Sequence, residues 1–171
     1  MIRIIVNYSM KKITILFLLS ITLSFGNSLG LSKMDIVILK KIKSLTDDNY
    51  MKYTLMAIAI KESSVGKNLV NPISNDYGLF QANIKSVIKR QKVKDTIDNR
   101  RYFAQKLVYD VGFSTANAIV EIDYWKKVHQ DNWIKIWASY NTGWSYSSNT
   151  GISYATSVFD IIKKLKYEYN L

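Results

Sequence analysis

The sequence predicts a mainly α-helical single domain with at most a small β-ribbon. Its 171 residues suit one compact domain, and a composition of 48% hydrophobic and 22% charged residues is that of a globular protein. Seven glycines and one proline are few for a loop-rich β-sandwich. Helical patterns account for most of the chain after residue 30, and only residues 64–78 are rich in Gly, Asn and Ser.

Two helices are predicted at the start of this domain. The pattern Ser32-x-x-Asp35 resembles a capping box and begins a helix that runs to about Ser44. A second helix is expected over residues 49–62, after two aspartates that can cap it. Residues 55–60 are apolar on every side of this helix, which places it in the core.

The rest of the domain is predicted to be one irregular loop followed by helices. Residues 64–78 form the loop, and any β-ribbon is expected there. Further helices are predicted near residues 83–91, 96–110, 114–129, 132–140 and 153–168.

Residues 1–30 have the pattern of an N-terminal extension followed by a signal peptide. Two lysines after Met10 precede an apolar run over residues 13–23, and small residues suited to cleavage follow. An apolar core of about 11 to 13 residues is too short for a permanent membrane span, although an uncleaved anchor is the alternative. We expect translation to start at Met10, residues 31–171 to form the mature domain, and the protein to be periplasmic or secreted.

Charge and composition narrow the chemistry. A net charge of +11 suits nucleic acid, an anionic membrane surface or an acidic polymer, unless it only reflects a lysine-rich composition. Export favours an envelope polymer over nucleic acid. The absence of Cys excludes thiol catalysis and Cys-ligated zinc, and a single histidine, His129, excludes a multi-His metal site. Carboxylate chemistry is therefore the natural choice for an enzyme.

Glu62 is the first candidate for that chemistry. Leu55, Ile58 and Ala59 precede it on the same face of the predicted core helix. Burial beside them would raise the pKa of the Glu62 carboxyl, which is what a proton donor at neutral pH requires. By itself, a glutamate near a helix end is more often a solvated charge.

Three motifs, in order and in approximate spacing, resemble the signatures of the lytic transglycosylase domain. Glu62-Ser63 follows the apolar helix, residues 78–81 read Gly-Leu-Phe-Gln, and residues 138–143 read Ala-Ser-Tyr-Asn-Thr-Gly. The family signatures are Glu-Ser, Gly-Leu-Met-Gln and Ala-Tyr-Asn-x-Gly, and Tyr154-x-x-x-Val158 resembles a Tyr-Val element that often follows them. The resemblance, over about residues 50 to 160, implies the lysozyme-like fold shared with goose-type lysozymes.

The chain departs from these signatures at a few positions. Phe80 replaces the usual methionine, and Ser139 stands where many members have alanine. Asp76 and Tyr77 precede the glycine of the second motif. That loop resembles the one in transglycosylases that accompany type IV secretion systems.

The resemblance implies a reaction with one carboxyl group and with no metal or organic cofactor. Glu62 would protonate the glycosidic oxygen between N-acetylmuramic acid and N-acetylglucosamine in peptidoglycan, with the substrate's own N-acetyl group assisting. The resulting carboxylate would take the proton of the C6 hydroxyl, whose oxygen closes onto C1. The products would carry 1,6-anhydro-N-acetylmuramic acid ends, as expected of a lyase.

The motifs also imply substrate-binding residues. Ser63 and Gln81 would hydrogen-bond the sugars or orient Glu62. The hydroxyl of Tyr140 would contact Glu62 or the N-acetyl group, and Asn141 would hold amide groups of the substrate or the loop. Trp144, just beyond the third motif in a polar loop, is a candidate for stacking on sugars in the cleft.

Two alternatives stay open. Asp76 could serve as a second acid that activates water, as in a goose-type lysozyme-like hydrolase. The domain could also grip glycan as an assembly factor of a secretion system, with little turnover. In each case the partners are peptidoglycan glycan strands and, for the assembly role, secretion-system components; we expect a monomer that binds no nucleic acid and has no membrane span after signal cleavage.

Overall fold

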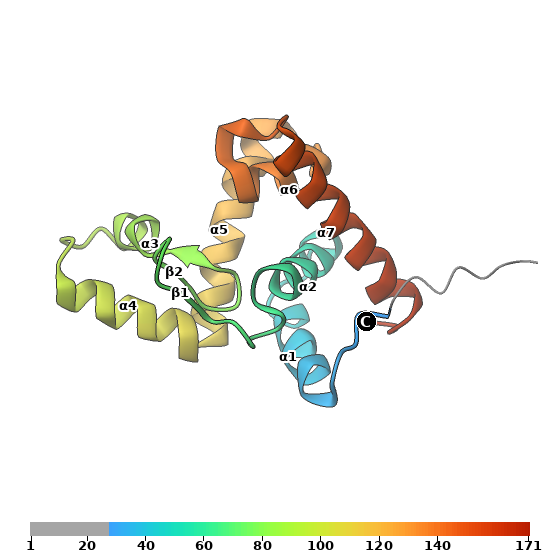
Figure 1. Ribbon diagram of the computed structural model, residues 1–171, viewed down its shortest axis with the longest axis horizontal. Helices are drawn as coiled ribbons and strands as arrows, with labels where there is room; N and C mark the ends of the chain where they lie inside the picture. The colour runs from blue at the N-terminus through green and yellow to red at the C-terminus, as the bar shows by residue number, and fades with distance from the viewer. Residues whose placement is uncertain (1–27) are drawn as a thin grey trace, which may run out of the picture.

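Seven α-helices and a small three-stranded sheet make up the part of the chain described by the computed structural model, residues 28–171 (Figure 1). The predicted extension and nearly all of the predicted signal peptide lie outside these residues. The helices are α1 (Lys33–Lys43), α2 (Asn49–Ser63), α3 (Ile84–Gln91), α4 (Ile97–Tyr109), α5 (Val111–His129), α6 (Trp133–Thr142) and α7 (Asn149–Tyr167). The strands are β1 (Val70–Asn71), β2 (Asp76–Tyr77) and β3 (Ala82–Asn83), and a 3-10 turn, η1, covers Gly143–Ser145.

The mainly helical prediction is confirmed, and the first two helices begin where local capping predicted. The Ser32 hydroxyl accepts a hydrogen bond from the Asp35 N–H at 3.1 Å, and the Asp35 carboxylate accepts one from the Ser32 N–H at 2.8 Å. Asp48 caps α2 by accepting from two N–H groups of its first turn. These side chains satisfy donors that have no partner inside the helix.

Two later helices begin earlier than predicted. Helix α5 starts at Val111 because the Asp110 carboxylate accepts from the Phe113 N–H at 2.9 Å. Helix α7 starts at Asn149, where the Ser148 hydroxyl plays the same role. In both cases the capping side chain lets the helix begin several residues before the first residues of its apolar pattern.

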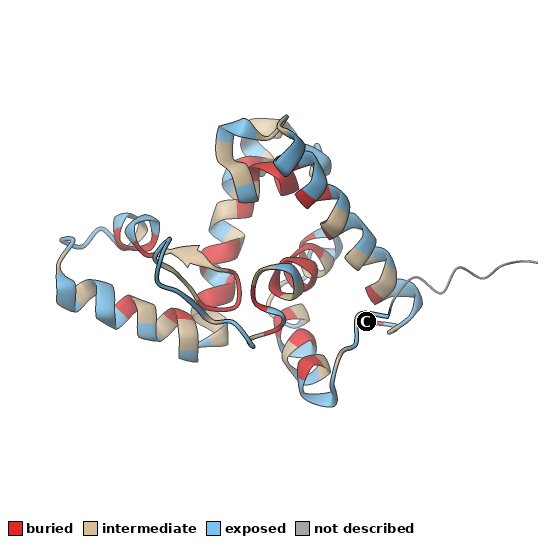
Figure 2. Cartoon of the chain, viewed as in Figure 1, coloured by how far each residue is buried: buried red, intermediate tan, exposed pale blue. Residues whose placement is uncertain are grey.

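Helix α2 occupies the centre of the larger hydrophobic core, as its all-round apolar sequence predicted. Its residues 55–59 are fully buried, and it packs against α1, α5 and α7 (Figure 2). The indole N–H of Trp137 in α6 donates to the buried Thr54 hydroxyl at 3.1 Å. This bond satisfies a polar group that would otherwise be costly inside the core.

A smaller core joins α3 and α4 on the other side of the molecule. It contains five buried side chains: Ile84, Val87, Ile88, Phe103 and Leu107. Helix α5 runs between this smaller lobe and the larger one (Figure 1). Within the described residues, no helix combines the length and the apolar character that a membrane span needs.

The three strands form an antiparallel sheet in the order β1-β2-β3, so the predicted ribbon gains a third strand from residues just after the loop. Tyr77 pairs with Val70 on one side and with Ala82 on the other. The turn after β2 depends on Gly78, whose φ of +82° favours glycine. A Cβ atom there would lie 2.3 Å from the carbonyl oxygen of Leu107 in α4.

We expect Gly78→Ala to lower the free energy of unfolding by about 2 to 4 kcal/mol, because it combines backbone strain with a clash against main chain. Urea-induced unfolding measured by circular dichroism provides the value. Gly112→Ala is the matched control, since Gly112 lies in the first turn of α5 and a Cβ atom there would meet only a side-chain atom, at 3.3 Å. It should change stability by less than about 1 kcal/mol; equal losses in the two variants would contradict the packing argument.

Candidate active site

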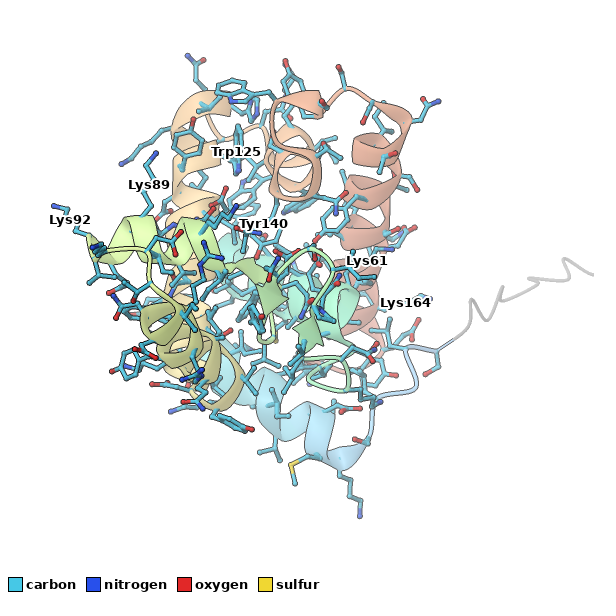
Figure 3. The ribbon with its side chains drawn as sticks, turned by 60° about the vertical axis from the view of Figure 1, so that its left-hand side comes forward. Lys61, Lys89, Lys92, Trp125, Tyr140 and Lys164 are labelled. Carbon is cyan, nitrogen blue, oxygen red and sulfur yellow. The ribbon has the colours of Figure 1, made fainter. Side chains whose placement is uncertain are left out.

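A polar pocket of about 260 Å³ lies where the two lobes and α5 meet. In Figure 3, the labelled Tyr140 marks this region, between Lys89 on α3 and Lys61 on α2. Apart from Ala82, the pocket is lined by polar side chains: Glu62, Asp76, Gln81, Asn83, Ser86, Arg90, Asn117, Glu121, Tyr140 and Asn141. Such a lining suits a ligand rich in hydroxyl and amide groups.

Glu62 projects into this pocket from the last turn of α2. Burial is the main cause that raises the pKa of its carboxyl, and the negative charge of Asp76 raises it further. A hydrogen bond from Tyr154 and the positive charge of Lys61 oppose the rise. The carboxyl therefore has the raised pKa that the apolar helix face predicted, and it can hold a proton at a higher pH than an exposed glutamate.

The hydroxyl of Tyr154 in α7 donates a hydrogen bond to Oε1 of Glu62 at 2.5 Å. Tyr154 is 6% exposed, and burial raises its pKa well above the usual tyrosine value, so the hydroxyl keeps its proton. The sequence identified Tyr154 only as part of a Tyr-Val element and assigned it no role. Its place in that element was the one signal that could have pointed to this contact.

Four of the predicted site residues line the same pocket as Glu62: Asp76, Gln81, Tyr140 and Asn141. The Tyr140 hydroxyl donates to the Phe80 carbonyl oxygen at 2.9 Å instead of to Glu62. The amide NH₂ of Gln81 donates to the carbonyl groups of Gly78 and Asn68. Both side chains thus hold the second motif in place while facing the pocket.

Ser63 does not line the pocket, so of its two predicted roles, bonding the sugars or orienting Glu62, the structure contradicts the first. Its side chain is fully buried, and its hydroxyl lies 2.9 Å from the Leu79 carbonyl oxygen and 3.1 Å from that of Ala59. It also accepts a hydrogen bond from the Gly66 N–H. As the last residue of α2, Ser63 turns inward and ties the helix end to the second motif.

Trp144 also lies away from Glu62. It stands in η1, 68% exposed, and lines a separate groove with His129 and Tyr146. The prediction that Trp144 lies in the same cleft as Glu62 is therefore wrong. The turn after the third motif carries its side chain outward, toward the end of α5, where its ring packs on Trp125.

Asp76, the possible second acid, lies in β2 opposite Asn83 of β3. One carboxylate oxygen of Asp76 accepts a hydrogen bond from the Asn83 amide at 2.9 Å. Its charge acts on the Glu62 carboxyl across the pocket. The structure thus brings the Glu62 and Asp76 carboxyl groups into one pocket, an arrangement that glycoside hydrolysis can use.

Sequence reasoning missed the far wall of the pocket. There, Arg90 of α3 forms an ion pair with Glu121 of α5 and approaches the Asn117 amide oxygen at 3.5 Å. The indole N–H of Trp125 donates to the other oxygen of Glu121 at 2.9 Å. No local pattern marks these residues, because the ion pair joins positions 31 residues apart.

Within residues 28–171, no group of three or more His, Cys, Asp or Glu side chains is placed to hold a metal ion. The carboxyl groups of the pocket are instead occupied by neighbouring donors: Tyr154 on Glu62, Asn83 on Asp76, and Arg90 on Glu121. What the pocket offers chemically is proton transfer by a half-buried carboxyl beside hydrogen-bonding groups.

Comparison with known proteins identifies one domain family. The family model described as "Transglycosylase SLT domain" matches residues 41–157. The chain is also 31% identical, over 116 residues, to the "uncharacterized 20.7 kDa protein in vs-regB intergenic region" of Enterobacteria phage T4. That match covers 67% of this chain and 62% of the phage protein, so the chain spans less than two thirds of its relative's length. No solved structure matches the chain.

The opposing influences on Glu62 can be separated by titration. Tyr154→Phe removes a hydrogen bond to the carboxylate and should raise the pKa of Glu62, whereas Asp76→Asn removes a nearby negative charge and should lower it. Titration of the ¹³C-labelled glutamate carboxyl signals by NMR measures both shifts. Shifts of the same sign in the two variants would rule out this account of the pocket.

Stability should depend on pH through the same carboxyl. Because the folded chain raises the pKa of Glu62, the stabilisation that its proton provides is full below the unfolded-state pKa and is lost as pH rises through the folded-state value. Glu62→Gln cannot ionise and still accepts from Tyr154. It should therefore melt a few degrees higher than the parent at neutral pH, and this difference should shrink in acid. Calorimetry of the two proteins over a pH series measures this difference in melting temperature. A difference that does not change with pH would contradict the link between stability and the Glu62 proton.

Proposed function

Because this chain belongs to the transglycosylase SLT domain family, whose fold is lysozyme-like, we propose that it is a peptidoglycan lytic transglycosylase with Glu62 as its only acid and base. The observation that carries the proposal is the half-buried Glu62 carboxyl, with its raised pKa and its hydrogen bond from Tyr154, in a polar pocket. The substrate bond would be the β-1,4 link between N-acetylmuramic acid and N-acetylglucosamine.

In the first step, protonated Glu62 gives its proton to the glycosidic oxygen as the bond from that oxygen to C1 of N-acetylmuramic acid breaks. The N-acetyl group of the same sugar assists the departure. The Tyr154 hydroxyl stays bonded to Oε1 throughout, which holds the carboxyl in one orientation and stabilises the negative charge left on it. Orientation of this kind is a main source of rate enhancement.

In the second step, the Glu62 carboxylate takes the proton of the C6 hydroxyl while that oxygen bonds to C1. The product carries a 1,6-anhydro ring, no water is consumed, and Glu62 ends protonated as it began. Burial and the Asp76 charge, which both disfavour the carboxylate, assist this recovery of the proton.

The surroundings of Glu62 support sugars on both sides of the broken bond. Asn141 lines the pocket and also an open groove of about 540 Å³ that continues along the start of α7. Lys61 and Tyr154 line that groove as well. A glycan strand could therefore cross Glu62 with one end in the pocket and the other in the groove, with Gln81, Tyr140 and Asn141 as its polar contacts.

A second candidate function is hydrolysis by Glu62 and Asp76. The observation that favours it is the position of Asp76 in the same pocket, close enough for its charge to affect Glu62. In that reaction Asp76 would activate a water molecule, and the product would have a reducing end.

The cellular setting forms part of the proposal. The signal-peptide pattern of residues 1–30 supports export to the periplasm or beyond the cell. The loop around Asp76 supports a link to type IV secretion, in which secretion-system components would be partners. If glycan binding alone served such an assembly, the role would survive the loss of the Glu62 acid.

Digestion of purified peptidoglycan sacculi tests the reaction. Mass spectrometry should find muropeptides with 1,6-anhydro ends, lighter than hydrolysis products by one water. Glu62→Gln should lower their rate of formation by about 100- to 10,000-fold, the usual contribution of a general acid and base. Glu168→Gln, the same change at an exposed position after α7, is the control and should keep the activity.

The products distinguish the candidates. Reducing ends that disappear in Asp76→Asn would replace the transglycosylase by the hydrolase. No products from folded protein, together with retained binding to sacculi, would leave only the assembly role.

A further inference from the structure

A second hollow, here called the aromatic groove, lies at the end of α5 beside η1. It measures about 380 Å³ and is lined by Val128, His129, Gln130, Lys135, Trp144 and Tyr146. Trp144 is 68% exposed. Such a large apolar side chain, in a hollow with polar neighbours, is a feature of ligand sites.

The rings of the groove are held in place by one another. Trp144 packs edge-on against the buried Trp125, with ring centroids 5.3 Å apart and an interplanar angle of 76°. His129 stacks on Trp125 at 5.8 Å, and Tyr146 meets the His129 ring edge-on at 4.7 Å. An exposed ring that is already ordered loses little conformational entropy when it binds a ligand.

Ser139 holds the His129 ring of this group in position. Its buried hydroxyl lies 2.8 Å from Nε2 of His129. Burial, assisted by the positive charge of Lys135, lowers the pKa of His129 and keeps the ring neutral at neutral pH. Ser139, which replaces the alanine usual in the third motif, thus has a structural explanation: its hydroxyl fixes His129 in the wall of the groove.

A row of side chains on α5 links the wall of the pocket to the aromatic groove. Asn117, Glu121, Trp125 and His129 follow one another at intervals of four residues, so each is a neighbour of the next on the helix surface and the row winds slowly around the helix. The first two line the pocket, and His129 lines the groove. Trp125 connects them, because its N–H donates to Glu121 while its ring supports Trp144. Figure 3 shows Trp125 above Tyr140.

The chemistry of the groove fits a saccharide. A sugar ring presents an apolar C–H face to an aromatic ring and hydroxyl groups to the polar side chains around it. Trp144 supplies the ring, and Gln130 supplies an amide. Lys135, whose ammonium lies 5.7 Å from the centre of the Tyr146 ring, supplies a positive charge for the carboxylate of N-acetylmuramic acid.

We propose that the aromatic groove is a second glycan-binding site, in which Trp144 stacks on a sugar of the same strand that occupies the pocket. The inference rests on the proposed function, since it requires glycan in the pocket. The second site makes binding depend on strand length: a short glycan occupies the pocket and the open groove beside α7, whereas a long one also covers Trp144.

Binding by the Glu62→Gln protein, which does not cleave the strand, tests this selectivity. The ligands are peptide-free tetrasaccharides and octasaccharides of alternating N-acetylglucosamine and N-acetylmuramic acid. The octasaccharide should bind about tenfold more tightly than the tetrasaccharide, and Trp144→Ala, added to Glu62→Gln, should abolish this gain. Trp144→Phe should keep part of it, and Tyr109→Ala, at an exposed aromatic residue at the end of α4, should keep all of it.

NMR of the indole N–H groups detects glycan at Trp144 in a protein whose groove carries no substitution. The Trp144 signal, assigned with Trp144→Phe, should shift with the octasaccharide and stay in place with the tetrasaccharide. An equal length preference in Trp144→Ala, or an unmoved Trp144 signal, would overturn the second site and leave the proposed function intact. If neither glycan binds any variant, the pocket itself does not hold the strand. That result would overturn the proposed function, and the second site with it.

Discussion

Two hydrogen bonds to consecutive main-chain carbonyl groups join the parts of the chain that make the pocket. The Ser63 hydroxyl, at the end of α2, bonds to the carbonyl of Leu79, and the Tyr140 hydroxyl of α6 donates to the carbonyl of Phe80. Carbonyl groups buried at such a position need a partner, because water cannot reach them. The turn that follows β2 is thereby fixed against the larger lobe, and Gln81 at its end lines the same pocket as Glu62.

The electrostatics of the pocket contrast with those of the whole chain. The protein carries a net charge of +11, yet three carboxyl groups and one guanidinium line the pocket. Burial and Asp76 favour the proton on Glu62, while Tyr154 and Lys61 favour its loss. The net effect is a raised pKa, which favours the protonated form that the proposed first step needs.

Helix α5 connects this chemistry to the rest of the surface. It runs between the lobes, and one of its faces carries the pocket wall at Glu121 and the support of the aromatic groove at Trp125 and His129. A polymer laid along that face would meet polar groups near Glu62 and a flat ring further on. The peptidoglycan strand that we propose as the substrate is a polymer of this extended kind.

The sequence by itself determined the helical fold, the burial of α2 and the position of Glu62 at its end, because capping and apolar periodicity act over a few neighbouring residues. The three motifs also indicated the family. Only the tertiary structure decided that Ser63 turns inward, that Trp144 lies outside the pocket and that Tyr154 bonds to Glu62. These outcomes depend on how helices pack, and the last joins residues 92 positions apart, a separation at which local sequence patterns carry no geometric information.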